Sequence, residues 1–415
     1  MRNNHIKGGD IVNKCQKVND KLKILIVHNY YQIPGGEDTV VSNERRILEE
    51  NGNEVFLYSR NNSELKNFNK IEKLVAAFSA VFSIKTYIKI KKLINELNID
   101  IVHVHNTLFL VSPSVYYAAR ICKVPVVQTI HNFRLLCPGA TFTRNNKICE
   151  DCIAKGVMNS VRHKCYRNSL TQTFLSALIL KIHRLSGTYA KINCYIALTE
   201  FNRNKLSKLV DENKIFVKPN FIFKNQEISY STNRNHFLFL GRLDKLKGID
   251  MLVDAWSQID KDKLIIAGTG PLEKDIKNKI KNNKIKNVKC IGFKSKDEIK
   301  ELMYNSRAVI VPSQWYEGFP MTILEAFSFG VPVIASDLGN LSSIVKDKEN
   351  GLLFKYVDKE SLVEKIRDLS ENDDLFKKLS MGALATFNEK YNEDINYSIL
   401  RSIYEECLGG TYDYI

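Results

Sequence analysis

Short runs of consecutive apolar residues alternate along the chain with longer stretches of helical periodicity. In the first half, predicted strands cover residues 23–28, 54–59, 100–106 and 125–132, and predicted helices cover about 39–51, 84–97 and 112–121. Strands that alternate with helices form parallel sheets. Residues 23–218 are therefore predicted to form one Rossmann-like domain, preceded by a polar, flexible tail at 1–22.

The same alternation restarts after a Lys218-Pro219-Asn220 linker. Predicted strands follow at residues 237–240, 264–271, 288–293, 308–313, 332–337 and 351–354, with helical patterns at 362–387 and 391–408. A single core stops growing near about 250–300 residues, so a chain of 415 residues is expected to hold two domains. Residues 219–390 are predicted to form the second Rossmann-like domain, and 391–415 a final helix and tail.

The stretch VPSQWYEGFPMTILEAFSFG (311–330) places two carboxylates, Glu317 and Glu325, around a tight turn that opens a helix. Free N–H groups at a helix start attract phosphate or a polarised hydroxyl. Glu325 is placed to accept hydrogen bonds from a diol such as a ribose, whereas Glu317 faces the cleft. The stretch therefore indicates a nucleotide-sugar site, and the alternative is a helix with an acidic first turn.

Candidate ligand-binding side chains follow several predicted strands. His105 and His131 end two strands, and Arg242 and Lys247 follow another. Ligands of doubly wound sheets bind in the crevice beyond the carboxyl ends of the strands. Arg242 can bind phosphate bidentately and Lys247 adds a point charge; the alternative is that both are ordinary surface residues.

Five segments together resemble family 4 retaining glycosyltransferases, which have the GT-B fold. They are the E-x7-E pair within EGFPMTILEAFSFGVPVIAS, the GRLDKLKG segment, the IAGTGP turn, the PGGE loop and the strand that ends at His131. The resemblance extends from about residue 23 to the C-terminus. It implies two Rossmann-like, doubly wound α/β domains facing across a cleft, the first binding the acceptor and the second the nucleotide sugar, with the last helix crossing back to the first domain.

The resemblance also implies roles for single residues. Arg242 and Lys247, after Gly241, would clamp the donor diphosphate, Glu325 would hold the ribose, and Glu317 would lie near the donor sugar. His131 would contact the sugar or its reacting face. The Gly318-Phe319-Pro320-Met321 turn would bind sugar oxygens through its backbone N–H groups, which every residue of the turn except Pro320 supplies. The Gly35-Gly36 loop, with Glu37 at its helix start, would close on the phosphates or the acceptor.

A net charge of +15 and a pI near 9.2 favour anionic partners. No recognisable nucleic-acid module is present, so nucleic acid is not expected as a partner. In the stretch 84–97, Tyr87, Ile90, Ile94 and Leu97 recur at helical spacing among lysines, which predicts either a core-facing helix or a peripheral membrane contact. Without a long apolar run or a signal peptide, the expected location is cytoplasmic, at the inner face of the cell membrane.

Four cysteines, Cys137, Cys149, Cys152 and Cys165, have the spacing C-x11-C-x2-C-x12-C within an insertion at 134–168. Such a set resembles a four-thiolate structural zinc site, in which His163 is an alternative to Cys165. Free thiols are the other interpretation. In either case the insertion is a candidate acceptor-recognition element.

The expected reaction is metal-independent transfer of a sugar with retention of configuration. A D-x-D sequence at Asp260 and Asp262 precedes a predicted strand, on the edge of the sheet away from the cleft, and is interpreted as a turn. The donor is expected to be a UDP-sugar in preference to GDP-mannose. The acceptor is expected to be a saccharide or a lipid-linked saccharide in bacterial cell-surface polysaccharide synthesis. The alternatives are a catalytically silent sugar-nucleotide-binding subunit of a synthase and a zinc-containing nucleic-acid-binding protein.

Overall fold

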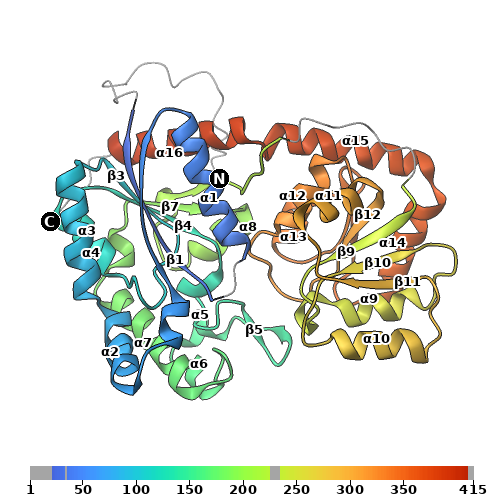
Figure 1. The fold of residues 1–415 in the computed structure, drawn as a ribbon, viewed down its shortest axis with the longest axis horizontal. Helices are drawn as coiled ribbons and strands as arrows, with labels where there is room; N and C mark the ends of the chain where they lie inside the picture. Colours follow the sequence, from blue (N-terminus) through green and yellow to red (C-terminus); the bar gives the residue numbers. More distant parts are fainter. Residues whose placement is uncertain (1–20, 33–34, 225–233, 410–415) are drawn as a thin grey trace.

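The computed structural model describes residues 21–32, 35–224 and 234–409. Two α/β halves lie beside each other, each built on a parallel sheet with helices on both faces (Figure 1). This confirms the predicted fold class. Of the tail predicted at 1–22, residues 1–20 lie outside the described residues, and Leu22 is buried in the structure.

The first sheet has the strand order β2-β1-β3-β4-β7-β8, and all its pairs are parallel. Its strands are β1 (Lys23–Tyr30), β2 (Glu54–Asn61), β3 (Ile101–Val104), β4 (Val126–Ile130), β7 (Cys194–Ala197) and β8 (Ile215–Val217). The strand order reverses between β1 and β3. The carboxyl ends of these two strands therefore form the topological switch point, where ligands of such sheets bind. The main helices around this sheet are α1 (Gly36–Glu50), α2 (Lys70–Val81), α3 (Ile84–Leu97), α4 (Ser114–Ile121), α7 (Leu170–Leu185) and α8 (Glu200–Leu206).

The second sheet has the order β11-β10-β9-β12-β13-β14, again with parallel pairs. Its strands are β9 (His236–Leu240), β10 (Leu264–Ala267), β11 (Val288–Gly292), β12 (Ser306–Val311), β13 (Val333–Ser336) and β14 (Gly351–Phe354). Its helices are α9 (Ile249–Trp256), α10 (Glu273–Asn282), α11 (Lys296–Tyr304), α12 (Met321–Ser328), α13 (Asn340–Ile344), α14 (Lys359–Glu371) and α15 (Asp373–Lys390). This is the dinucleotide-binding strand order, and its switch point lies between β9 and β12.

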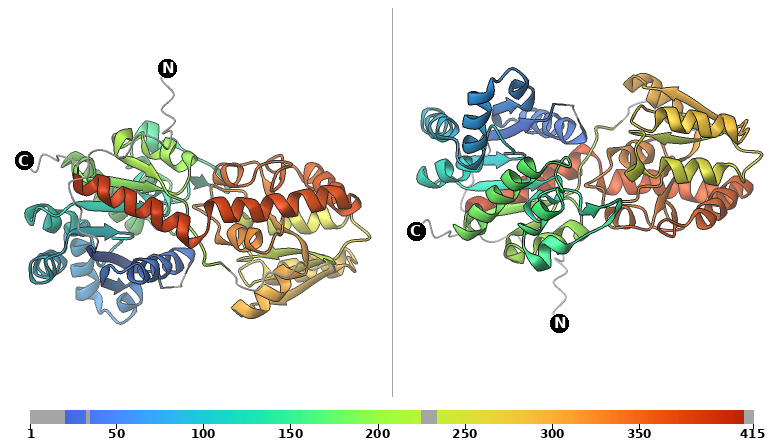
Figure 2. Two further views of the ribbon diagram at one scale, coloured as in Figure 1. Left: turned by 90° about the horizontal axis from the view of Figure 1, so that it is seen from above. Right: turned by 90° about the horizontal axis from the view of Figure 1, so that it is seen from below.

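The last helix, α16 (Glu393–Gly409), returns to the first half. Seen from above, α15 and α16 run one after the other along the two halves (Figure 2). Leu400, Ile403 and Tyr404 of α16 are buried against the first sheet, in a core shared with Ile24 and Ile196. The predicted crossover helix is therefore confirmed.

The cysteine-bearing insertion folds between β4 and α7 as a short hairpin and two short helices: β5 (Thr143–Arg144), β6 (Lys147–Ile148), α5 (Asp151–Lys155) and α6 (Asn159–Arg162). Elsewhere, Ile90 and Ile94 of α3 are buried in the core of the first half. Tyr87 and Leu97 are partly buried against the same core, so the core-facing interpretation of this helix is confirmed. No described helix is both long and apolar enough to cross a bilayer.

Candidate active site

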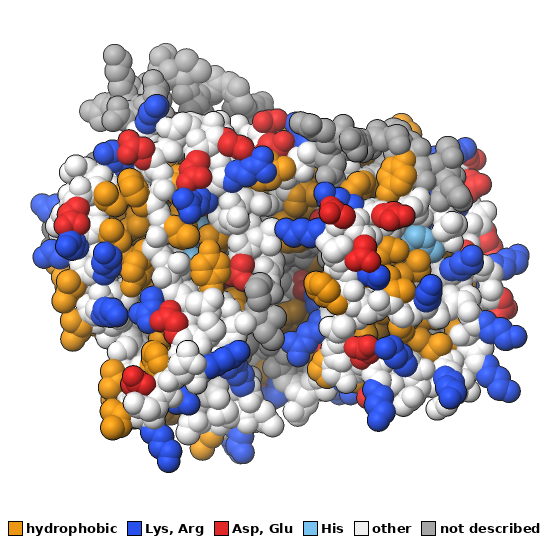
Figure 3. Space-filling view, viewed as in Figure 1, with side chains coloured by type: hydrophobic (Ala, Val, Ile, Leu, Met, Phe, Trp, Pro, Cys, Tyr) orange, Lys and Arg blue, Asp and Glu red, His pale blue; other side chains and the backbone are white. Residues whose placement is uncertain are grey.

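Loops from the carboxyl ends of the two sheets touch each other. A Cβ atom on Gly318 would lie only 2.3 Å from the carbonyl oxygen of His131 in the other half, so only glycine permits this approach. Asn340 supports the same loop, since its Nδ2 donates to the carbonyl oxygens of Glu317 (2.5 Å) and Gly318 (2.6 Å) and to Asn202 Oδ1 (2.7 Å). The space-filling view shows a hollow between the halves (Figure 3). The two switch points therefore face one cleft.

Glu317 is held in place by three donors. Its Oε1 accepts hydrogen bonds from Lys247 Nζ (2.7 Å), Ser313 Oγ (2.6 Å) and Trp315 Nε1 (2.9 Å), and the residue is 5% exposed. These three donors occupy the lone pairs of this oxygen. Glu317 is therefore arranged to position Lys247, and Oε1 is a poor nucleophile.

Lys247 and Arg242 both follow β9. Lys247 ends the 3₁₀ turn Lys245–Lys247, whose first N–H groups are capped by Asp244: its Oδ1 accepts from Lys247 N (3.1 Å). The next residue, Gly248, has φ +70°, and a Cβ there would lie 1.9 Å from the Pro312 carbonyl oxygen. The Arg242 side chain is 62% exposed, with its Nε 3.5 Å from Asp244. The turn after β9 packs on the loop after β12 and carries two cations. Lys247 is held by its ion pair with Glu317, whereas the Arg242 side chain is largely exposed.

The start of α12 is uncapped. Its N-cap is Pro320, which provides no side-chain acceptor for the first N–H groups of the helix. Phe319 is buried in the core of the second half and packs against Tyr391, with ring centroids 6.0 Å apart. Burial raises the pKa of Glu325, on the second turn, while Lys296 opposes this rise.

The start of α1 faces α12 across the cleft. A Cβ on Gly36 would lie 3.4 Å from Met321 Cγ. Asp38 caps α1, because its Oδ2 accepts from Gly35 N (3.0 Å). Burial, with the charge of Asp38, raises the pKa of Glu37 to about 8, which leaves Glu37 mostly protonated at neutral pH. The uncapped start of α12 therefore favours a bound anion, whereas the start of α1 is already occupied by the Asp38 carboxylate.

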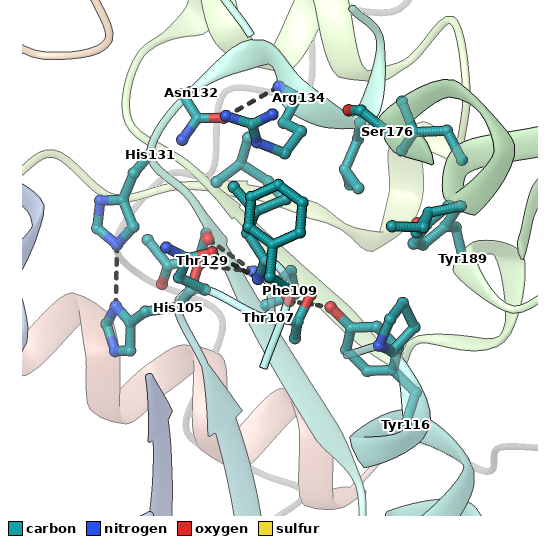
Figure 4. A pocket seen from close by; sticks show the side chains of 18 of the residues that line it. His105, Thr107, Phe109, Tyr116, Thr129, His131, Asn132, Arg134, Ser176 and Tyr189 are labelled. Atoms are coloured by element: carbon teal, nitrogen blue, oxygen red, sulfur yellow. Dashed lines mark hydrogen bonds between the residues drawn. The ribbon is translucent and has the colours of Figure 1, made fainter. Parts of the chain in front are cut away.

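A series of buried polar contacts connects His131, at the cleft, with Lys218 in the interior of the protein. His131 Nε2 and His105 Nδ1 are 2.9 Å apart (Figure 4), and His105 Nε2 lies 3.4 Å from Glu44 Oε2. Glu44 Oε1 accepts from Lys218 Nζ (2.6 Å), which also donates to Asn396 of α16 (3.2 Å). Burial lowers the pKa of His131 to about 3 and that of His105 well below its usual value, so both rings are neutral. If Glu44 accepts the Nε2 proton of His105, His131 donates from Nε2 and presents an acceptor, Nδ1, to the cleft.

A cavity of about 70 Å³ adjoins His131 in the first half. Its polar wall comes from strand ends and the following loops, with Thr107, Thr129 and Arg134, and its apolar wall includes Phe109 and Leu180 (Figure 4). The cavity therefore offers mixed polar and apolar contacts beside the predicted sugar contact.

The four cysteines of the insertion are neighbours without forming a closed site. Burial, followed by the nearby Cys137, Cys165 and Cys149 thiols, raises the pKa of Cys152 to about 12. Within the described ranges, the one group of three or more His, Cys, Asp or Glu ligand atoms within 4.8 Å of one another is Glu44, His103 and His105. Four thiolates about 2.3 Å from one zinc would lie closer together than that limit. The thiols as placed do not fit a bound zinc.

The D-x-D sequence lies at the amino end of β10, away from the cleft. Asp262 accepts a hydrogen bond from Ser370 Oγ (2.7 Å), and its carbonyl oxygen accepts from Trp256. The interpretation of this sequence as a turn is confirmed.

Several residues of this arrangement are not evident from the sequence. Ser313, Trp315 and Asn340 fix the Glu317 loop, and Glu44 and Lys218 support the histidines. One signal was available. Three first-half segments read His-Asn at or just beyond a strand (28–29, 105–106 and 131–132), and this repetition marks one sheet edge.

Two family models match the chain in consecutive segments. One, described as glycosyltransferase family 4, covers residues 34–224, and the other, glycosyl transferases group 1, covers residues 221–384. An uncharacterised glycosyltransferase of Methanocaldococcus jannaschii is 34% identical over 237 residues, which are 55% of this chain and 66% of the relative. A relative from Campylobacter jejuni is 31% identical over 163 residues, 37% of this chain and 44% of its own length. Its name describes an alpha-1,4-N-acetyl-D-galactosaminyltransferase and includes a PP-undecaprenol-linked saccharide.

The chain spans about two thirds or less of the length of these curated relatives. Among solved structures, Anabaena HepE in complex with UDP is similar in fold, with a TM-score of 0.65, 18% identity and coverage of 92% of this chain and 99% of that protein. The first family model covers the half that contains the first sheet, and the second covers the half that contains the second sheet. The fold agrees with that of the structural neighbours. The chain therefore belongs to the family 4 glycosyltransferases, which have the GT-B fold.

Proposed function

We propose that this protein is a retaining, metal-independent glycosyltransferase that uses a nucleotide-sugar donor. The observation that carries the proposal is the Lys247–Glu317 pair at the switch point of the second sheet, with Arg242 beside it. Release of a nucleoside diphosphate requires stabilisation of its negative charge. Lys247, Arg242 and the uncapped start of α12 supply that stabilisation from the protein.

Each residue of the cleft takes a distinct role in the proposed reaction. Arg242 and Lys247 hold the diphosphate, and Glu325 accepts hydrogen bonds from the ribose hydroxyls. Glu317 orients Lys247 and is not a covalent nucleophile. His131 accepts a hydrogen bond from the sugar through Nδ1. The acceptor hydroxyl attacks from the face that the phosphate leaves, and the departing phosphate takes the proton, so the anomeric configuration is retained.

We propose UDP-sugars in preference to GDP-mannose as donors. UDP is the ligand named for the structurally similar Anabaena protein. The proposed acceptor is a saccharide or a lipid-linked saccharide used in bacterial cell-surface polysaccharide synthesis, at the inner face of the membrane. The C. jejuni relative, whose name includes a PP-undecaprenol-linked saccharide, supports this acceptor class. The cavity and the cysteine insertion beside His131 are the proposed acceptor contacts.

The experiment that tests the activity is a donor screen. Purified protein is incubated with UDP-glucose, UDP-galactose, UDP-N-acetylglucosamine or GDP-mannose, each with and without EDTA, and nucleotide release is measured. Release from one UDP-sugar in EDTA supports the proposal, and proton NMR of a transferred sugar then reports whether its anomeric configuration is retained. Binding without release or transfer would support the silent-subunit alternative. The family match favours a transferase over the nucleic-acid-binding alternative.

A structural zinc ion held by Cys137, Cys149, Cys152 and Cys165 is retained as a separate proposal. Its support is the gathering of four thiols in one insertion. The side chains would have to close by rotation, because their placement lacks the required short separations. Elemental analysis of the purified protein tests it: about one zinc per chain that is lost in a Cys149→Ser/Cys152→Ser variant supports the site, and metal-free, stable protein refutes it.

A further inference from the structure

Helix α2 turns its large apolar side chains outward. Ile71, Leu74, Val75 and Phe78 are 75%, 60%, 58% and 72% exposed. At about 100° per residue, these four positions fall within an arc of about 100° on the helix. We name this stripe the α2 face.

The opposite side of α2 holds small residues. Ala80 is buried, and Ala76 and Ala77 are half-buried. An amphipathic helix normally buries its large apolar residues and exposes polar ones. The inverted orientation of α2 leaves a continuous apolar surface of the kind that marks an interaction site.

The surroundings of the α2 face are strongly basic. Residues 66–95, which contain α2 and most of α3, hold seven lysines and one acidic residue, Glu72. Residues 152–199, which contain α6 and α7, hold seven basic residues and neither Asp nor Glu. Helix α7 packs against α2, as His183 Nε2 lies 2.9 Å from the Val81 carbonyl oxygen. Figure 3 shows hydrophobic side chains at the lower left, where α2 lies, with Lys and Arg nearby.

The α2 face is also linked to the candidate acceptor cavity. Ala80 of α2 and Ser176 and Leu180 of α7 line the cavity that reaches His131. A surface bound along α2 would therefore lie next to the proposed acceptor site.

We propose that the α2 face docks on an anionic lipid bilayer and brings the acceptor cavity to lipid-linked substrates. The proposal rests on the proposed function and specifies the surface that meets the membrane. Apolar side chains with flanking lysines suit the boundary between acyl chains and anionic headgroups. A second copy of this chain is disfavoured, because a twofold interface would oppose one basic rim to the same basic rim. The N-terminal residues 1–20 are also disfavoured as a cover, since they are polar and carry four basic and two acidic side chains.

The test is sedimentation of the full chain with vesicles of phosphatidylglycerol and phosphatidylethanolamine, compared with phosphatidylcholine vesicles. We expect binding to the anionic vesicles that weakens with salt. Leu74→Ser/Phe78→Ser should weaken the partition coefficient at least about tenfold, and Lys70→Gln and Lys73→Gln about fivefold each. Phe293→Ser is the matched control, because Phe293 is 81% exposed in the second half. This variant should bind as the wild type does.

Titration with UDP separates this inference from the proposed function. All variants should bind UDP as the wild type does, because the changes lie outside the donor cleft. Failure of the wild type to bind anionic vesicles, or equal binding by the Leu74→Ser/Phe78→Ser variant, would overturn the docking surface while leaving the donor site standing. A dimer in sedimentation velocity that this variant disperses, without vesicle binding, would assign the face to a second copy instead. Absence of UDP binding in the wild type would contradict the proposed function itself.

Discussion

Replacement of Lys218 by methionine is the sharpest test of the buried network behind the site. Lys218 and Glu44 are both 0% exposed, and their Nζ and Oε1 atoms are 2.6 Å apart. Methionine keeps similar length and volume but carries no charge. In Lys218→Met, Glu44 retains only longer contacts with His105, at 3.4 Å, and His103, at 3.8 Å, and the Asn396 side chain loses one donor.

Removing one partner of a buried ion pair costs about 3–5 kcal/mol of unfolding free energy, since the remaining charge is uncompensated. The full range applies here because neither side chain is exposed. For a unit of about 200 residues, 1 kcal/mol lowers Tm by about 2–4 °C, so Lys218→Met should lower the Tm of the first half by roughly 10 °C. Burial raises the pKa of Glu44, but Lys218 and His105 outweigh burial and lower it. The stabilisation is present above about pH 4.5 and is lost as pH falls through the lowered pKa of folded Glu44, so the difference from wild type should shrink below about pH 4.5.

Urea unfolding followed by circular dichroism at pH 7.5 measures the effect. The control is Glu44→Gln/Lys218→Met, which removes both charges and should be more stable than Lys218→Met by at least about 1 kcal/mol. A loss of less than about 1 kcal/mol in Lys218→Met would contradict a stabilising buried pair. A loss in the double variant equal to the sum of the losses in Lys218→Met and Glu44→Gln would show that the two residues are not coupled.

Three further predictions concern the cleft. Lys247→Ala should lower kcat about a hundredfold or more, measured as nucleotide release, because the leaving group loses a fixed cation; near-wild-type turnover would reject this role. Gly318→Ala should hold the halves apart, since the added Cβ meets the His131 carbonyl oxygen, and we expect reduced sugar transfer with little change in UDP affinity in a calorimetric titration; unchanged transfer would show that the contact is not needed. Stability should fall below pH 6.5 by up to about 1.4 kcal/mol per pH unit for each of His105 and His131, since their lowered pKa values keep them neutral in the fold while the unfolded chain takes up protons; a flat urea midpoint from pH 7 to 5 would contradict this.

The sequence was sufficient for the architecture because consecutive apolar runs and helical periodicity are local signals. They located the six strands of the second sheet and four of the six strands of the first, missing β7 and β8, and residues such as Arg242 and His131 follow predicted strands. The Glu317 loop was likewise evident from its glycine and proline. These features depend on neighbours in the chain, which a single sequence records.

Contacts between distant residues were not predictable. Glu44 and Lys218 are 174 positions apart, and nothing in either local pattern indicates a partner. The orientation of an amphipathic helix is also not local: α3 buries its stripe in the core, whereas α2 exposes one of similar spacing. Periodicity reports that a helix has an apolar side, and the tertiary fold decides whether that side is covered.

Calorimetric titration of the wild type and Lys247→Ala with UDP and GDP, with and without EDTA, tests the donor site most directly. The proposed function predicts that UDP binds the wild type more tightly than GDP does, that EDTA leaves this affinity unchanged, and that Lys247→Ala weakens it at least about tenfold. Absence of nucleotide binding, or binding that EDTA abolishes, would contradict a donor site in which protein cations alone hold the diphosphate.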